Sequence, residues 1–248
     1  MNIKDRIQSI QKQIQMEAHH CQRNFSDIQL VAVSKKHSAD HVWSAIQAGA
    51  SILGENYIQE ARDKIKDIEL MHQKNPHVPK PSWHFIGHLQ RNKAKYAVRC
   101  FDLIHSVDSI ELAEEIDRCA QKQNKHQNIL IQVSTGETTK SGMMPHHLES
   151  MLQAAMSLSN IAICGLMIMP PYSDHPEDSR PHFKHLAGLL KQIKTHSGQQ
   201  TQHPLNHLSM GMTGDYHVAI QEGATFIRVG TAIFGNRPIE SISIKEKT

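Results

Sequence analysis

The sequence lacks any long apolar segment. The longest apolar run covers residues 161–169 and stops at Pro170 and Pro171. It is far shorter than the roughly 20 residues that a membrane-spanning helix needs. The first residues, from Met1 to Arg6, are polar and charged, and no apolar stretch follows them, which argues against a secretory signal. These absences predict a cytoplasmic protein that does not insert into a membrane.

Cysteine is also scarce, and the charge is nearly balanced. The four cysteines, Cys21, Cys100, Cys119 and Cys164, include no Cys-x-x-Cys pair, so free thiols in a reducing compartment are expected rather than a disulfide framework. Lysine and arginine number 27 against 24 acidic residues, a net charge of +3. A dedicated nucleic-acid-binding protein usually carries a strong basic excess. We therefore expect no nucleic-acid partner.

Histidine, by contrast, is abundant, with 19 residues. Three close pairs, His19–His20, His146–His147 and His182/His185, invite a metal-site interpretation. None of them has the His-Glu-x-x-His or Cys/His spacing that metal sites show. We expect these histidines to be solvated at the surface and the protein to hold no metal.

A strand followed by a helix recurs along the chain. The first segment is an amphipathic helix with Ile3, Ile7, Ile10 and Ile14 on one stripe. Eight strands are then expected, at 28–34, 51–54, 83–86, 102–106, 128–133, 161–169, 206–209 and 225–229. Helices are expected at 39–47, 56–66, 92–99, 109–123, 145–157, 176–195 and 215–221, with a last turn or helix from about residue 231.

The pattern of eight strand–helix units predicts the fold class. Near-continuous apolar strands such as 30–33 and 129–133 are typical of parallel sheets that are covered on both faces. Eight such units match a (β/α)8 TIM barrel, and we expect one domain over residues 1–248 with an extra N-terminal helix. A doubly wound open sheet is the alternative, but it usually has a glycine-rich turn after its first strand. Here Ser34 to His37 contain no glycine.

The end of the first strand carries a candidate nucleophile. In a TIM barrel the site lies at the carboxyl ends of the strands, and Lys35 follows directly behind the apolar residues 30–33. Desolvation there would lower the pKa of its ammonium group and make a neutral amine available for Schiff-base chemistry with an aldehyde. The alternative is a lysine that merely extends to solvent at a strand end.

The segments 208–213 and 227–235 form a candidate phosphate site. In this fold the loops after the seventh and eighth strands commonly bind phosphate. Gly230 would let the backbone approach a ligand, Ser209 and Thr231 offer hydroxyl groups, and a helix from about residue 231 would aim N–H groups at an anion. The glycines could equally serve only to close turns.

A lysine and a phosphate site together suggest pyridoxal 5'-phosphate (PLP). Its aldehyde would condense with Lys35, and its phosphate would lie at Ser209, Gly230 and Thr231. Arg228 would point inward to the pyridine nitrogen. A cation there disfavours protonation of the nitrogen, so the ring would be a weak electron sink.

Five motifs carry a resemblance to a known family. They are LVAVSK (30–35), LGENYIQE (53–60), HFIGHLQRNK (84–93), LSMGMT (208–213) and IRVGTAIFG (227–235). In this order they resemble the pyridoxal phosphate homeostasis protein family, whose barrel is similar to the N-terminal domain of alanine racemase. The resemblance implies that Lys35 forms the Schiff base. It also places five residues around the cofactor: Asn56, Ser209, Arg228, Gly230 and Thr231.

The resemblance leaves carrier and enzyme readings to be weighed. Racemisation needs two bases, and in the racemases a tyrosine from a second domain supplies one of them. Here the barrel motifs end at Gly235, and the remaining residues are too few for such a domain, although Tyr57, Tyr172 and Tyr216 could reach the rim.

We therefore expect a monomeric, non-catalytic protein that holds PLP, buffers it or hands it to apo-enzymes. A PLP-dependent, racemase-like enzyme is the alternative. An interaction module that uses PLP only for stability is a third reading.

Overall fold

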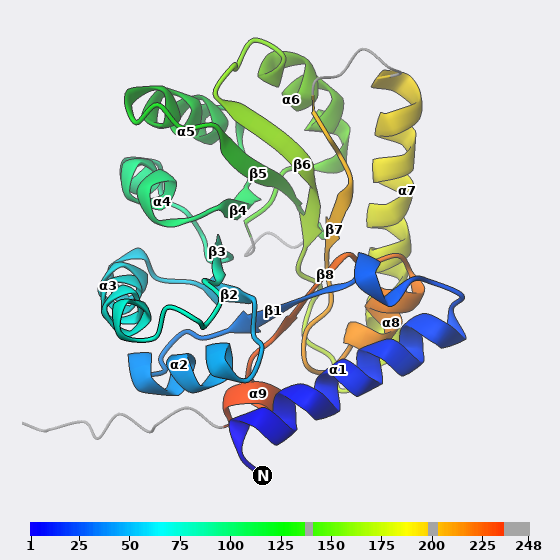
Figure 1. The fold of residues 1–248 in the computed structure, drawn as a ribbon. Coiled ribbons are helices and arrows are strands. Elements are labelled where there is room, and N and C mark those ends of the chain that lie inside the picture. The colour runs from blue at the N-terminus through cyan, green and yellow to red at the C-terminus, as the bar shows by residue number, and fades with distance from the viewer. Residues whose placement is uncertain (137–140, 198–202, 236–248) are drawn as a thin grey trace, which may run out of the picture.

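The computed structural model describes residues 1–136, 141–197 and 203–235 (Figure 1). Its strands form one closed parallel barrel in which each strand pairs with the next along the chain and the last pairs with the first. This architecture confirms the predicted (β/α)8 TIM barrel. The strands are β1 (Gln29–Val33), β2 (Ile52–Glu55), β3 (Ser82–Phe85), β4 (Leu103–Val107), β5 (Gln127–Val133), β6 (Ile161–Ile168), β7 (His207–Ser209) and β8 (Phe226–Val229).

The helices surround this barrel. They are α1 (Ile3–His20), α2 (Ala39–Gln47), α3 (Ile58–Lys74), α4 (Ala94–Cys100), α5 (Ile110–Lys122), α6 (Leu148–Ala155), α7 (Arg180–Ser197), α8 (Tyr216–Gln221) and α9 (Thr231–Phe234). The expected extra N-terminal helix is α1, drawn in dark blue in Figure 1, and it packs on the outside against α2, α8 and α9. The first and last segments of the described chain therefore lie side by side.

Local sequence explains where α1 begins and which side it buries. The Asn2 side chain accepts from the backbone N–H of Asp5, and Asp5 returns the bond, which makes a capping box. The predicted apolar stripe is confirmed, because Ile7, Ile10 and Ile14 are buried. Burial of this stripe attaches the helix to the barrel.

Helix α3 is longer than predicted. The prediction ended it near residue 66, within a charged stretch, whereas it continues to Lys74. The reason is that its buried side includes Lys64 and His72 as well as Ile68, so polar residues conceal the stripe in the sequence. The His72 ring packs edge-on against Trp43 of α2 with centroids 4.7 Å apart. By contrast, α2 has the predicted bounds and the predicted Ser38 cap.

The apolar core has two parts. A large cluster fills the space between the barrel and its helices. A smaller cluster lies inside the barrel and includes Val31, Leu130, Met167 and Phe226. The interior is therefore packed, as in other TIM barrels, and a ligand can enter only at the strand ends.

Gly165 in β6 pairs with His207 of β7 at a position that leaves no room for a side chain. Its φ is +155°, and a Cβ atom there would lie 1.9 Å from the carbonyl oxygen of His207. We expect Gly165→Ala to destabilise the protein by about 3 kcal/mol, because the backbone of β7 would have to move. Urea unfolding would measure this. Gly188→Ala in α7 is the matched control, because nothing lies within 4 Å of a Cβ there. Equal midpoints for the two variants would contradict the expectation.

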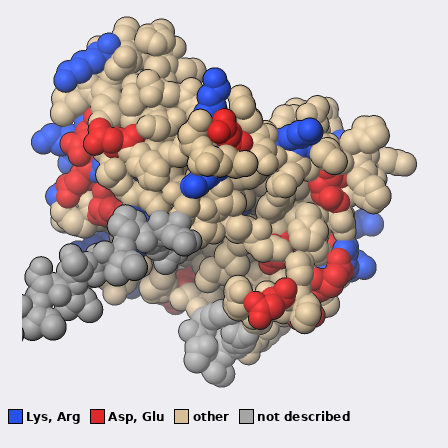
Figure 2. Space-filling view, turned by 90° about the horizontal axis from the view of Figure 1, so that it is seen from below, with Lys and Arg blue, Asp and Glu red and all other residues tan. Residues whose placement is uncertain are grey.

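Two further findings bear on the sequence expectations. Among the described residues, no helix combines the length and the apolar character that crossing a bilayer requires. On the face seen in Figure 2, acidic and basic side chains are interspersed rather than gathered by sign. Residues 236–248, on which the expectation of no second domain depends, lie outside the described part of the chain.

Candidate functional site

Strand register brings the predicted residues of the first, second and eighth strands to one mouth of the barrel. Val33 of β1 pairs with Gly54 of β2, so Lys35 and Asn56 follow at equivalent levels two residues later. On the other side, Ala32 pairs with Val229 of β8, which sets Gly230 beside Val33. Lys35 is half-buried, and its strand lies between the strands that lead to Asn56 and Gly230.

Asn56 presents a polar atom that the protein leaves unpaired. Its side-chain oxygen Oδ1 is buried and has no hydrogen-bond partner. Gly87, after β3, packs closely against it, since a Cβ there would lie 2.3 Å from the Asn56 carbonyl oxygen. Only glycine permits this approach, and it fixes the Asn56 backbone at the rim. Buried polar atoms are rarely left unpaired, so a donor from a ligand is the expected partner.

Arg228 places a buried cation below this rim. Its Nη1 donates to Ser209 Oγ at 2.6 Å, and its Nη2 donates to the Ile168 carbonyl oxygen at 3.0 Å. Within the described chain it makes no ion pair with a carboxylate. Burial lowers the pKa of Arg228 to about 10, against a smaller opposing effect of Asp215. An unpaired buried charge is costly, so this position favours an anionic or electron-rich ligand.

Ser209, which was predicted to lie at the phosphate, contacts Arg228 within the barrel. Its side chain is fully buried between Arg228 and His105, whose Nδ1 is 2.8 Å from Ser209 Oγ. His105 Nε2 in turn lies 3.0 Å from His84 Nδ1. These four side chains form a hydrogen-bonded column inside the barrel, which we call the interior polar column. Ser209 therefore supports Arg228 from below.

Burial keeps both histidines of the column neutral. Desolvation lowers the pKa of His84 to about 4, and it holds the pKa of His105 well below the usual value, with further lowering by His84 and Arg228. Sequence reasoning did not single out either residue, because it considered only the histidines that occur in close pairs. The available signal was their position on the third and fourth strands, where alternate side chains point inward.

Thr213 was also missed as an individual site residue. Its hydroxyl oxygen lies 3.5 Å from that of Thr231, so the loops after β7 and β8 bring two hydroxyl groups together at the rim. At neighbouring Gly230, a Cβ would be 3.4 Å from the nearest protein atom, an ordinary contact. Packing within the protein thus does not explain the glycine, whereas a ligand lying against the backbone would.

The surface prediction for the three histidine pairs agrees with the structure. His19, His20, His146, His147 and His185 are exposed, and His182 is half-exposed. Five other histidines, which the prediction did not cover, are buried: His37, His72, His84, His105 and His203. In the described chain, no group of three or more potential ligands could hold a metal ion.

The candidate rim tyrosines lie in different surroundings. Tyr216 Oη donates to Gln13 Oε1 on α1 at 2.6 Å, so its hydroxyl points to the outside of the barrel. Tyr172 is 85% exposed and donates to Asp174. Tyr57 is half-exposed and remains next to Asn56.

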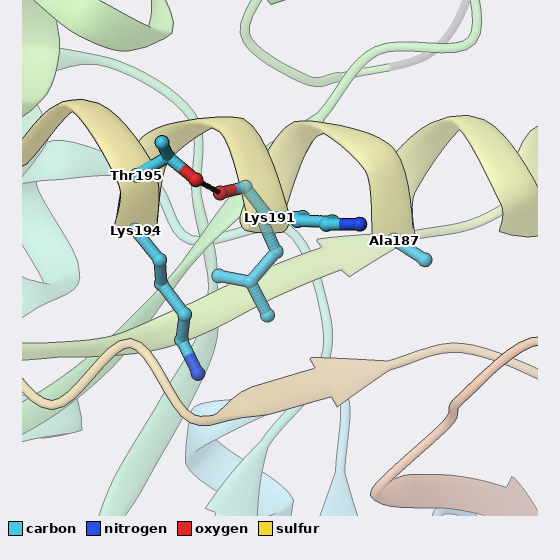
Figure 3. Close-up of a pocket in the computed structure, with 5 residues that line it drawn as sticks. Ala187, Lys191, Lys194 and Thr195 are labelled. Atoms are coloured by element: carbon cyan, nitrogen blue, oxygen red, sulfur yellow. Dashed lines mark hydrogen bonds between the residues drawn. The ribbon is translucent and has the colours of Figure 1, made fainter.

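Two hollows differ in their relation to the rim. A cavity of about 400 Å³ adjoins Asn56 and is lined also by Tyr57, Arg62, His88, Lys93 and Tyr96. A shallower hollow of about 340 Å³ lies on the flank along α7 and is lined by Ala187, Lys191 and Lys194 (Figure 3). Only the first is continuous with a predicted site residue.

The chain is similar to known proteins over nearly its whole length. The family described as the alanine racemase N-terminal domain matches residues 6–238. The pyridoxal phosphate homeostasis protein of Aquifex aeolicus is 37% identical over 241 residues, which cover 96% of this chain and 99% of that protein. PipY of Synechococcus elongatus, solved with PLP bound, is 35% identical with a TM-score of 0.79, covering 94% of this chain and all of PipY.

More distant structures share only the fold. Alanine racemase of Clostridium difficile is 15% identical with a TM-score of 0.61, and the match covers 93% of this chain but 57% of the racemase. The similarity therefore spans the barrel and leaves a large part of that enzyme unmatched.

Proposed function

Since this chain belongs to the pyridoxal phosphate homeostasis protein family, we propose that it binds PLP as a Schiff base on Lys35 and serves PLP homeostasis. The observation that carries the proposal is the buried Arg228 guanidinium, which makes no ion pair in the described chain and lies below the rim that bears Lys35. A buried cation of this kind costs free energy unless a ligand compensates it.

The residues present fit the chemical groups of PLP. PLP supplies an aldehyde that condenses with a primary amine. Lys35 provides the amine, and the Thr213 and Thr231 hydroxyl groups with the open backbone at Gly230 would hold the phosphate. Asn56 Oδ1, buried and unpaired, would accept a hydrogen bond from the ligand. The aldehyde, the phosphate and a hydrogen-bond donor of PLP thus each have a counterpart at the same mouth of the barrel.

Arg228 and Ser209 would act together at the pyridine ring. Arg228 would direct a positive charge at the ring nitrogen and keep it unprotonated, and Ser209 would fix the guanidinium in place through its 2.6 Å hydrogen bond. A ring held in this way withdraws electrons weakly and suits storage better than carbanion chemistry. We therefore propose a non-catalytic carrier, in which Lys35 retains the cofactor until an acceptor takes it.

The proposal extends to the setting of this role. We propose one PLP-binding domain over residues 1–248, acting as a monomer in the cytoplasm. All four thiols are free, and the match to the alanine racemase N-terminal domain covers residues 6–238. Light scattering after size exclusion would test the oligomeric state.

Borohydride trapping tests the attachment. The protein is incubated with PLP, reduced, digested and mapped for the modified lysine. We expect a yellow protein before reduction and the label on Lys35 afterwards. A protein that takes up no PLP, or a label spread over exposed lysines, would overturn the proposal.

Two assays separate a carrier from an enzyme. Incubation of the loaded protein with single amino acids should give no D/L interconversion or CO2 release above free PLP. When the loaded protein is mixed with an apo-enzyme that requires PLP, the activity of that enzyme should be restored. Clear turnover in the first assay would instead favour the racemase-like alternative.

A further inference from the structure

A cluster of buried charges lies behind the turn that carries Lys35. Lys64 of α3 and Glu55 at the end of β2 form an ion pair with Nζ and Oε1 2.5 Å apart, and their side chains are 4% and 0% exposed. Glu60, one helical turn before Lys64, adds a second carboxylate 2.9 Å from the same Nζ. Breaking a buried pair is strongly destabilising, so such a cluster keeps its geometry.

Each member of the cluster also binds the chain next to Lys35. The Ser34 hydroxyl donates to Glu55 Oε1 at 2.6 Å, and the Ser34 carbonyl oxygen accepts from Lys64 Nζ at 2.7 Å. On the other side, the Lys36 backbone N–H donates to Glu60 Oε1 at 2.5 Å. The residues immediately before and after Lys35 are therefore both fixed from behind.

The turn itself needs this support. Residues 34–37 form a tight turn closed by the His37 N–H and the Ser34 carbonyl oxygen at 3.2 Å. Lys36 occupies its third position with φ +63°, a left-handed conformation that usually belongs to glycine. A lysine adopts it unfavourably, and the bond from its N–H to Glu60 offsets that cost.

We propose that Lys64 and Glu60 are positioning residues for Lys35: the buried cluster that they form with Glu55 holds the turn in the conformation that presents the Lys35 amine to the barrel mouth. This inference rests on the proposed function of Lys35. Both residues contact the backbone on either side of Lys35. They act by fixing the backbone from which the amine extends, and a small displacement of a reacting group is enough to weaken its chemistry.

Two variants test the cluster, with one matched control. Lys64→Met removes the buried charge at similar length, and Glu60→Ala removes the acceptor of the Lys36 N–H. Lys66→Met makes the same change as the first at an exposed position of the same helix. We expect PLP to dissociate about tenfold faster from the two test variants, which corresponds to about 1.4 kcal/mol. We also expect borohydride to label Lys36 as well as Lys35 in them.

A second substitution distinguishes positioning from a loss of folding. In the double variant Glu60→Ala, Lys36→Gly, the glycine adopts the left-handed conformation without help, so PLP retention should recover toward that of the wild type. The Glu60 and Lys36 variants remain informative even if Lys64→Met fails to fold. Neither of these residues is buried, so their substitution should not prevent folding. Recovery is expected if Glu60 supports the turn.

The outcomes keep this inference separate from the proposed function. Wild-type protein that is not labelled at Lys35 would refute the proposed function itself. Wild-type protein labelled at Lys35, with Glu60→Ala retaining PLP as well as Lys66→Met does, would overturn the positioning role alone. So would a Glu60→Ala defect that Lys36→Gly leaves unchanged.

Discussion

Lys35→Ala is expected to lose the visible absorbance of the loaded protein and to bind PLP at least about a hundredfold more weakly, which corresponds to about 2.7 kcal/mol. The reason is that the Schiff base is the one covalent contact in the proposed site. The remaining contacts, from Arg228, Thr213 and Thr231, would still hold the phosphate and the ring reversibly. Spectrophotometric titration with PLP, at constant salt, measures the dissociation constant.

The matched control is the neighbouring lysine. Lys36→Ala removes the same kind of amine one residue away, from an exposed side chain, and alanine is no more strained than lysine at its positive φ. We expect this variant to keep the absorbance and to transfer PLP to an apo-enzyme, whereas Lys35→Ala should do neither. Equal loss in both variants, or in neither, would show that Lys35 is not the attachment point.

The interior polar column should make the folded state sensitive to acid. His84 is buried, and its pKa falls from 6.5 to about 4 on folding. As the pH falls, His84 of the unfolded chain is therefore protonated near pH 6.5, whereas His84 of the folded chain is protonated only near pH 4. Stability from this difference is complete above pH 6.5 and is lost as the pH falls toward 4. At about 1.4 kcal/mol per pKa unit, the loss is about 3 kcal/mol, and His105 acts in the same direction.

His84→Asn isolates this effect. The asparagine oxygen can take the place of Nδ1 as a partner for His105, but it does not titrate. Urea unfolding of the apo-protein at pH 7 and pH 4.5 should show a smaller acid loss in this variant than in the wild type. His185→Asn, at an exposed position on α7, provides the control for removing a histidine. If wild type and His84→Asn lose equal stability between pH 7 and pH 4.5, the conclusion that His84 stays neutral in the folded protein is refuted.

Much of the fold followed from patterns that a single chain displays. Continuous apolar strands separated by amphipathic helices predicted the barrel, and the rule that parallel barrels carry their sites at the strand ends selected Lys35, Gly230 and Thr231. The barrel prediction succeeded because each strand–helix unit depends on residues close together in sequence, and the site residues stay predictions. Strand register then set Lys35 beside Asn56, which no local pattern states.

What escaped prediction has a common physical cause. Lys64, His84 and His105 are polar residues in buried positions, and sequence reasoning assigns such residues to solvent. Each is buried only because a partner from another element meets it: Glu55 meets Lys64, and Ser209 meets His105. Such pairs join distant segments, so they become visible only in three dimensions. For the same reason the prediction ended α3 too early, because Lys64 and His72 lie on its buried side.

The buried guanidinium of Arg228, which makes no ion pair in the described chain, favours ligand binding at the expense of stability. Replacing a buried charge with a well-packed apolar side chain is often neutral or stabilising, so the protein without its vitamin gains little from keeping this arginine. Selection for thermostability alone would therefore tend to replace Arg228 with an apolar residue. The more stable variants would be those that bind PLP least well.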